Sequence, residues 1–129
     1  MRTVIRVTRH PLNDAREAFL KGIYGDDVRV VTEDVSYGDD PIAAVKELIE
    51  RIGGEVTAIE AQAPLPVLMK LVDRSRDLGV TLIRAQFERD KGGRAIVVGK
   101  DDKGRDLLKF SHYEELEKIE FRTRRLKPR

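Results

Sequence analysis

The sequence predicts a single α/β domain with a Rossmann-like, three-layer architecture and a mainly parallel sheet. Short segments rich in β-branched residues alternate three times with amphipathic segments of helical period, and a fourth strand-like segment follows. Such an alternation is typical of parallel strands joined by right-handed helical crossovers. The length of 129 residues fits one domain and leaves little room for a second.

The first strand and the first helix are predicted near the N-terminus. Residues 3–8 are rich in β-branched side chains and end at a turn, which is typical of a strand. Pro11 suits the first position of a helix, because its missing N–H would have no partner there. Apolar residues then follow at helical spacing: Leu12, Ala15, Phe19 and Ile23. We expect this helix to end near Gly22 and Gly25.

The second and third strands flank a helix that has a strong start signal. Strands are predicted over residues 28–32 and 56–60, where apolar and β-branched side chains are frequent. Between them, Asp39-Asp40-Pro41 places an acidic cap before a proline, which is typical of a helix start. We expect this helix to end at Gly53-Gly54.

A third helix and a fourth strand complete the alternating part of the chain. Pro64 and Pro66 open the helical segment, and Gly79 ends it. The fourth strand is predicted over residues 81–87.

After Asp90 the alternation gives way to turns and short strands. Strands are predicted over residues 95–98 and 107–110, and apolar residues alternate with charged ones over 119–124, which predicts a half-exposed last strand. We therefore predict two parts of one domain of residues 1–129: a Rossmann-like core, residues 1–90, and an antiparallel β extension with a basic tail, residues 91–129.

Composition excludes several classes of protein. The chain has no cysteine, which excludes disulfides, thiolate metal sites and thiol nucleophiles. Charged residues make up 37% of the chain although the net charge is only +2, and Asn and Gln are scarce, which favours a thermophilic source. No segment resembles a signal peptide or is apolar over the thickness of a bilayer. We therefore expect a cytoplasmic protein with no membrane partner.

The C-terminal segment carries the one marked skew in charge. Between residues 118 and 129 a single acid, Glu120, stands against six basic residues: Lys118, Arg122, Arg124, Arg125, Lys127 and Arg129. A basic tail on a nearly neutral domain suits an anionic partner, and it equally suits a terminus that is simply solvated.

The turn after the first strand is the best candidate for a site. In open α/β sheets, ligands bind beyond the carboxyl ends of the strands, where helix N-termini favour anions. At this edge Arg9 offers a fork of donors for phosphate, His10 titrates near neutral pH and caps the predicted helix, and Thr8 and Asn13 lie beside them. The alternative is that His10 only caps the helix while Arg9 pairs with an acidic neighbour.

Gln62 and Pro64 form a second candidate after the third strand. An amide on a turn framed by prolines suits contact with a base or a ribose, although ordinary loop chemistry explains it equally well. The only other histidine, His112, reads as a surface residue. Phosphotransfer would require it to lie near His10.

Motifs for bound cofactors and metals are missing. Gly99-Lys100 is followed by Asp101 where a phosphate loop needs Ser or Thr, and the first turn has no G-x-G-x-x-G. No His and carboxylate cluster has ligand spacing for zinc. We therefore expect neither a cofactor nor a metal.

The segment Val7-Thr8-Arg9-His10-Pro11 resembles the opening of a small CRISPR-associated ring nuclease family, whose members are compact, Rossmann-like relatives of the CARF domain. A related ring nuclease family has a similar His-Pro-Leu turn, matched by His10-Pro11-Leu12, and a proline-rich turn, matched by Ala63-Pro64-Leu65-Pro66. By element order the resemblance covers roughly the first two-thirds of the chain. The extension after Asp90 departs from the family.

The resemblance implies a homodimer that binds cyclic oligoadenylate across its two-fold axis, in type III CRISPR defence signalling. It implies metal-independent cleavage, in which a ribose 2′-OH attacks the adjacent phosphorus and leaves a 2′,3′-cyclic phosphate. Arg9 would hold the scissile phosphate and His10 would orient groups or transfer protons, which makes them the expected catalytic residues. The expected ligand-binding residues are Thr8, Asn13, Gln62 and Pro64.

Two other functions remain open from the sequence. The chain could be a non-enzymatic Rossmann-like adaptor that binds nucleic acid or a protein through its basic C-terminal strand. It could also be an assembly protein that pairs with partners through a strand edge.

Overall fold

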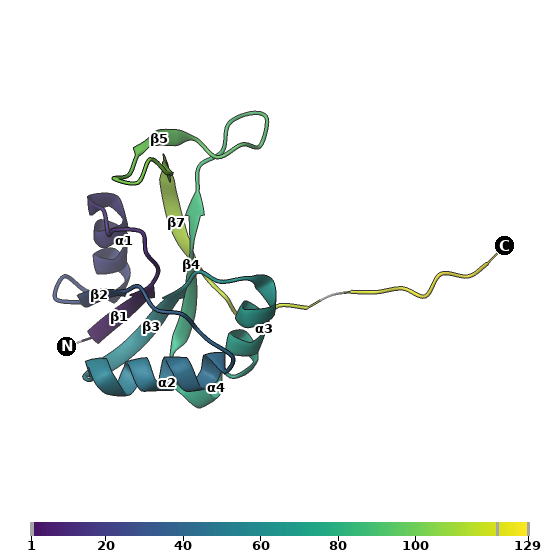
Figure 1. Ribbon diagram of the computed structural model, residues 1–129, viewed down its shortest axis with the longest axis horizontal. Helices are drawn as coiled ribbons and strands as arrows, with labels where there is room; N and C mark the ends of the chain where they lie inside the picture. Colours follow the sequence, from purple (N-terminus) through teal and green to yellow (C-terminus); the bar gives the residue numbers. More distant parts are fainter. Residues whose placement is uncertain (1, 121, 129) are drawn as a thin grey trace.

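The computed structural model describes residues 2–120 and 122–128 of the chain. Its strands are β1 (Arg2–Val7), β2 (Arg29–Glu33), β3 (Glu55–Ala61), β4 (Thr81–Phe87), β5 (Val97–Lys100), β6 (Asp106–Leu108) and β7 (Phe110–Glu115), and its helices are α1 (Asp14–Tyr24), α2 (Pro41–Ile52), α3 (Leu65–Asp73) and α4 (Ser75–Leu78). A five-stranded, mostly parallel sheet has the order β2-β1-β3-β4-β7, and β5 and β6 form a small antiparallel sheet (Figure 1). The protein is therefore an α/β protein with a mainly parallel sheet, as the alternation predicted.

Pairing within the main sheet is uneven. β1 pairs in parallel with β2 and β3 along its length, and β7 pairs antiparallel with β4. In contrast, β3 and β4 share only three residue pairs, from Ala58↔Thr81 to Glu60↔Ile83. The sheet is therefore open between the carboxyl ends of β3 and β4.

Two core clusters bury the alternating side chains of the sheet. Val4 of β1 packs in a cluster with Leu20 of α1, whereas Ile5 packs in a second cluster with Val45 of α2 and Leu71 of α3. All five of these side chains are fully buried. Strands buried in this way carry near-continuous apolar runs, and this is why the sequence pattern showed the strands clearly.

The predicted ends of several elements are confirmed. The Asp40 side chain accepts a hydrogen bond from the Ala43 backbone N–H, and Pro41 is the first residue of α2. Gly53 ends α2 with φ +70°, and Gly79 ends α4 in the left-handed conformation with φ +68°, where a side chain would be strained. The predicted strand over residues 81–87 coincides with β4.

Two predictions about helices were wrong. The first helix begins at Asp14 and not at Pro11, because Asn13 supplies the cap: its side chain accepts a hydrogen bond from the Arg16 backbone N–H. His10 therefore does not cap a helix. The single helix expected up to Gly79 is interrupted at Arg74 and divides into α3 and α4.

The C-terminal extension differs most from its prediction. The expected strand over 107–110 is divided between β6 and β7, and the strand that joins the main sheet is β7, which includes His112. Residues 116–120 and 122–128 form no strand, so the strand expected over 119–124 is wrong for the residues described, and Phe121 lies outside them. The place beside β4 is occupied by β7. Leu116 and Ile119 still pack against the core, and residues 122–128 run away from the body of the molecule (Figure 1).

Within the described part of the chain, no helix combines the length and the apolar character needed to cross a bilayer.

Candidate functional site

A hollow of about 410 Å³ lies at the carboxyl ends of β1 and β3, and we call it the carboxyl-edge hollow. Its lining includes five of the six residues that the sequence singled out: Thr8, Arg9, His10, Gln62 and Pro64. Because β2 and β3 lie on opposite sides of β1, the strand order reverses at this point. In open α/β sheets such a switch point is where ligands bind.

Thr8 holds the turn against the end of β3. Its hydroxyl donates a hydrogen bond to Gln62 Oε1 at 2.6 Å and accepts one from the His10 backbone N–H at 3.2 Å. Its own backbone N–H donates to the carbonyl of Glu33, which extends the β1–β2 pairing. Thr8 is buried and serves the geometry of the turn, whereas Gln62 is exposed.

Arg9 is an exposed cation beside the hollow. It forms no ion pair or hydrogen bond with any of residues 2–120 and 122–128. The alternative in which Arg9 pairs with an acidic neighbour therefore does not describe this structure. A guanidinium in this position is available to an anionic group of a ligand.

His10 lies half-buried behind Arg9. Burial lowers the pKa of His10 below its ordinary value, and the nearby charges of Arg16 and Arg105 lower it further. The imidazole is therefore neutral at pH 7. A neutral imidazole can accept a proton from a ligand hydroxyl, which a cationic one cannot.

Asn13 and His112, which were also considered from the sequence, do not line the carboxyl-edge hollow. The Asn13 side chain is engaged as the cap of α1, at 2.9 Å from the Arg16 backbone N–H. His112 lies on β7 between Ser111 Oγ at 2.7 Å and Glu114 Oε1 at 3.1 Å. Neither lines the space around Arg9.

A second hollow, of about 450 Å³, continues from the first and shares Arg9 and Asp34 with it. Its far side is the turn of the β5–β6 hairpin, which contributes Lys100, Lys103 and Arg105. Lys100 and Arg105 are held within the hairpin by Asp106 and Asp101, at 2.9 and 2.7 Å. In the sequence, Lys100 stood out only as part of a segment that does not match a phosphate-binding loop. A strand pattern does not predict which part of the molecule a hairpin packs against, so the place of Lys100 beside Arg9 could not be foreseen.

A buried ionic cluster behind the turn was not predicted. Arg6 Nε lies 3.2 Å from Glu60 Oε1 and Arg6 Nη1 lies 3.0 Å from Thr32 Oγ1, while the Tyr113 hydroxyl also donates to Glu60 Oε1. Arg16 of α1 approaches the other oxygen of Glu60. Two charged residues within apolar strands, Arg6 and Glu60, were the available signal, since buried parallel strands seldom carry charge.

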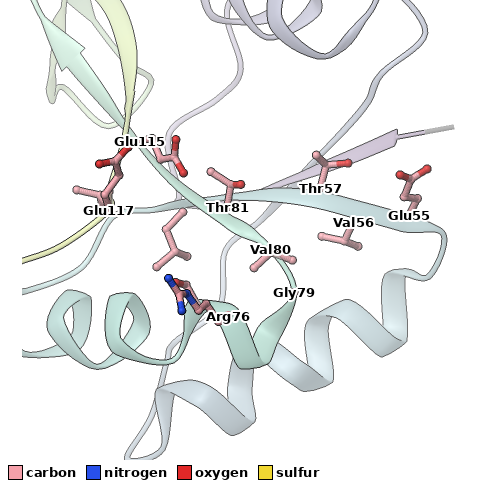
Figure 2. A pocket seen from close by; sticks show the side chains of 12 residues that line it. Glu55, Val56, Thr57, Arg76, Gly79, Val80, Thr81, Glu115 and Glu117 are labelled. Carbon is pink, nitrogen blue, oxygen red and sulfur yellow. The ribbon is translucent and has the colours of Figure 1, made fainter.

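A larger hollow lies elsewhere, at the amino ends of β3 and β4, with a volume of about 770 Å³ (Figure 2). Figure 2 shows Glu115 and Glu117 on one side of it, Glu55 at the other end, and Arg76 of α4 below. Three carboxylates against one guanidinium disfavour an anionic ligand. Because it also lies at the edge of the sheet opposite to the switch point, we assign the candidate site to the carboxyl-edge hollow.

Among residues 2–120 and 122–128, no group of three His, Cys, Asp or Glu side chains is arranged to hold a metal ion.

Comparison of the chain with family models, with curated proteins and with solved structures gave no match.

Proposed function

We propose that the carboxyl-edge hollow binds a phosphate-bearing ligand, and that this ligand is a cyclic oligoadenylate which the protein cleaves without a metal. The observation that carries the proposal is the exposed Arg9, which has no partner among the described residues and lies beside a neutral His10 at the switch point of the sheet. The resemblance of the Thr8-Arg9-His10-Pro11 turn to the ring nuclease families supplies the choice of ligand.

The fold is compatible with this proposal. α1 contributes to one core cluster, and α2 and α3 contribute to the other. We propose on this basis that the domain is a Rossmann-like, three-layer structure, with helices covering both faces of the sheet.

The reaction would need groups that the hollow offers and a proton from solvent. The ribose 2′-OH attacks the adjacent phosphorus, the bond from phosphorus to the 5′ oxygen breaks, and a 2′,3′-cyclic phosphate remains. His10 takes the proton of the 2′-OH and the leaving 5′ oxygen takes a proton from solvent. Arg9 stabilises the charge that develops on the phosphoryl oxygens. Gln62 and Pro64 line the place of the adjoining nucleoside.

A homodimer follows from the size of the ligand. The carboxyl-edge hollow, at about 410 Å³, is too small to enclose a ring of four nucleotides. Two copies that face one another across a two-fold axis would present two identical hollows to a two-fold ligand, which requires an isologous interface.

The test is incubation of the purified protein with cyclic tetra-adenylate in EDTA, followed by mass spectrometry of the products. We expect linear products that end in a 2′,3′-cyclic phosphate. Arg9→Ala should abolish turnover without loss of stability, because Arg9 is exposed. Arg29→Ala is the matched control, since Arg29 is exposed at the start of β2, at the other edge of the sheet, and should keep full activity. Intact ligand together with no detectable binding would end the proposal.

A second function is favoured by one observation, the C-terminal tail. Residues 122–128 are exposed, carry no secondary structure and extend from the body of the molecule (Figure 1). We propose as the alternative that this basic segment binds nucleic acid electrostatically. Its affinity for a single-stranded oligonucleotide should then fall steeply with salt and disappear when the residues after Phe121 are removed. Binding that is insensitive to salt would exclude this alternative.

A further inference from the structure

A slot opens where β3 and β4 separate beyond the pair Glu60↔Ile83. It has a volume of about 220 Å³, and we call it the β3–β4 slot. Residues of both strands, of α1 and of α3 line it, among them Arg16, Glu60, Gln62, Leu68, Arg84 and Phe87. It adjoins the carboxyl-edge hollow at Gln62 and Ala63, and its other lining residues are different.

Arg16 lies in the wall of the slot with its hydrogen-bonding capacity unused. Its side chain is only 8% exposed, and its Nε is buried without a hydrogen-bond partner among the described residues. Its Nη1 is 3.8 Å from Glu60 Oε2, which is beyond hydrogen-bonding distance. A guanidinium has five N–H donors, and removing it from water without partners carries a large free-energy penalty.

Aromatic rings hold this guanidinium in place but do not satisfy its donors. The Arg16 Cζ atom lies 5.3 Å from the centre of the Phe87 ring and 5.7 Å from that of Phe110. Cation–π contacts at these distances stabilise the charge and fix its position. The N–H groups remain available to an acceptor that enters the slot.

The charges around the slot are not balanced. Glu60 already accepts hydrogen bonds from Arg6 Nε and from the Tyr113 hydroxyl, so one carboxylate faces the two buried cations Arg6 and Arg16. The Nη2 atom of Arg6 is also buried without a partner among the described residues. Arg84, which is exposed, adds a further cation at the lining, and Glu60 is the only acid there among the residues described.

We propose that the β3–β4 slot binds a small organic oxyanion, a carboxylate or a phosphate monoester carried on a compact apolar group. The oxyanion accepts hydrogen bonds from Arg16 and neutralises the excess charge of the cluster, because guanidinium groups bind such oxygens in a fork. The apolar group packs between Leu68 and Phe87. This site does not depend on the function proposed for Arg9.

The test uses the full chain labelled with ¹⁵N and follows the arginine Nε–Hε signals by NMR. Sodium benzoate, phenyl phosphate and inorganic phosphate are titrated separately, with sodium chloride of equal ionic strength as the reference. We expect the Arg16 signal and the Gln62 side-chain amide to shift and saturate with benzoate or phenyl phosphate, and to stay unchanged with chloride. The arm that saturates at the lower concentration decides between carboxylate and phosphate.

Variants separate this site from the others. Arg16→Lys keeps the charge and removes the fork, so it should weaken binding about tenfold or more, as expected for loss of one charge-assisted hydrogen bond. Arg84→Gln, at an exposed residue, keeps the fold and should also weaken binding. Arg76 is exposed on α4 at the opposite edge of the sheet, so Arg76→Gln removes the same charge and should leave anion binding in the slot unchanged. The Arg9→Ala variant should also bind the anion in the slot normally.

An Arg16 signal that no anion moves would overturn the proposal, because buried water would then be the partner of the guanidinium. Equal weakening by Arg84→Gln and Arg76→Gln would overturn it too, since only the net charge would matter. If Arg16→Lys does not fold, the comparison of Arg84→Gln with Arg76→Gln still decides.

Discussion

At the scale of the residue, His10 is the group whose charge state sets the chemistry of the carboxyl-edge hollow. Its pKa is lowered by burial and by the cations Arg16 and Arg105, so the folded protein takes up its proton at a lower pH than the unfolded chain does. Between these two pKa values the unfolded state binds more protons, and the protein loses stability as the pH falls below the ordinary histidine value of 6.5.

His10→Gln should remove this contribution to the pH dependence of stability. We expect the wild-type chain to lose more stability than the variant between pH 7 and pH 5, as measured by urea denaturation at the two pH values. Equal losses in both proteins would show that His10 is not perturbed. In the enzyme assay, wild-type turnover should fall as the pH drops through the lowered pKa of His10, because only the neutral imidazole accepts a proton.

The buried cluster around Glu60 gives a second prediction at this scale. Glu60→Gln leaves Arg6 and Arg16 without a counter-charge and should lower the free energy of unfolding by about 3–5 kcal/mol. Tyr113→Phe removes one donor to a carboxylate that keeps other partners, so it should cost about 1–2 kcal/mol. Glu17→Gln, in a half-exposed pair with Lys21, is the control and should change stability by less than about 0.5 kcal/mol. Denaturant unfolding measures all three.

The residues of the carboxyl-edge hollow were predictable from the sequence, and Arg6 and Glu60 of the buried cluster left a signal in it, whereas Arg16 of that cluster did not. Thr8 and Gln62 follow parallel strands, and parallel strands end at one edge, so their place at that edge follows from the element order. Their hydrogen bond at 2.6 Å also requires β1 and β3 to be neighbours, and that pairing is a finding of the structure. Arg16 is different, because its burial depends on which helical face meets the open end of the sheet. That packing is a tertiary property, and neither periodicity nor spacing around Arg16 contains it.

At the scale of the element, the position of Asn13 decides between two roles. In the structure its side chain caps α1, and Asn13 does not line the carboxyl-edge hollow. Asn13→Ala should therefore lower stability by about 0.5–2 kcal/mol, and Asn13→Asp, which keeps a capping oxygen, should restore most of it. Thermal unfolding measures this effect. A variant that keeps its stability but loses affinity for cyclic tetra-adenylate would contradict the capping role.

Elements were predictable where the pattern was local and strong. The start of α2 at Asp40 and Pro41 and the whole of β4 follow from caps, glycines and β-branched runs. The part after Asp90 was not, because short strands with mixed charge fit several pairings. The arrangement of this part depends on which segment pairs with the free edge of β4, and in the structure that segment is β7.

At the scale of the whole molecule, the proposed ligand requires that two chains bind one ring. One carboxyl-edge hollow cannot enclose a four-nucleotide ring, so two chains must share each ring if the proposal is right. Light scattering should give the mass of a dimer, either for the free protein or after cyclic tetra-adenylate is added to the Arg9→Ala variant. Calorimetry should give one bound ring for every two chains. If the variant proves too weak a binder, the same titration can be done with the wild-type chain and a ring whose 2′ oxygens are methylated, which cannot be cleaved. One ring for each chain, or a monomer that binds the ring at full affinity, would rule out the two-fold site even if Arg9 holds phosphate.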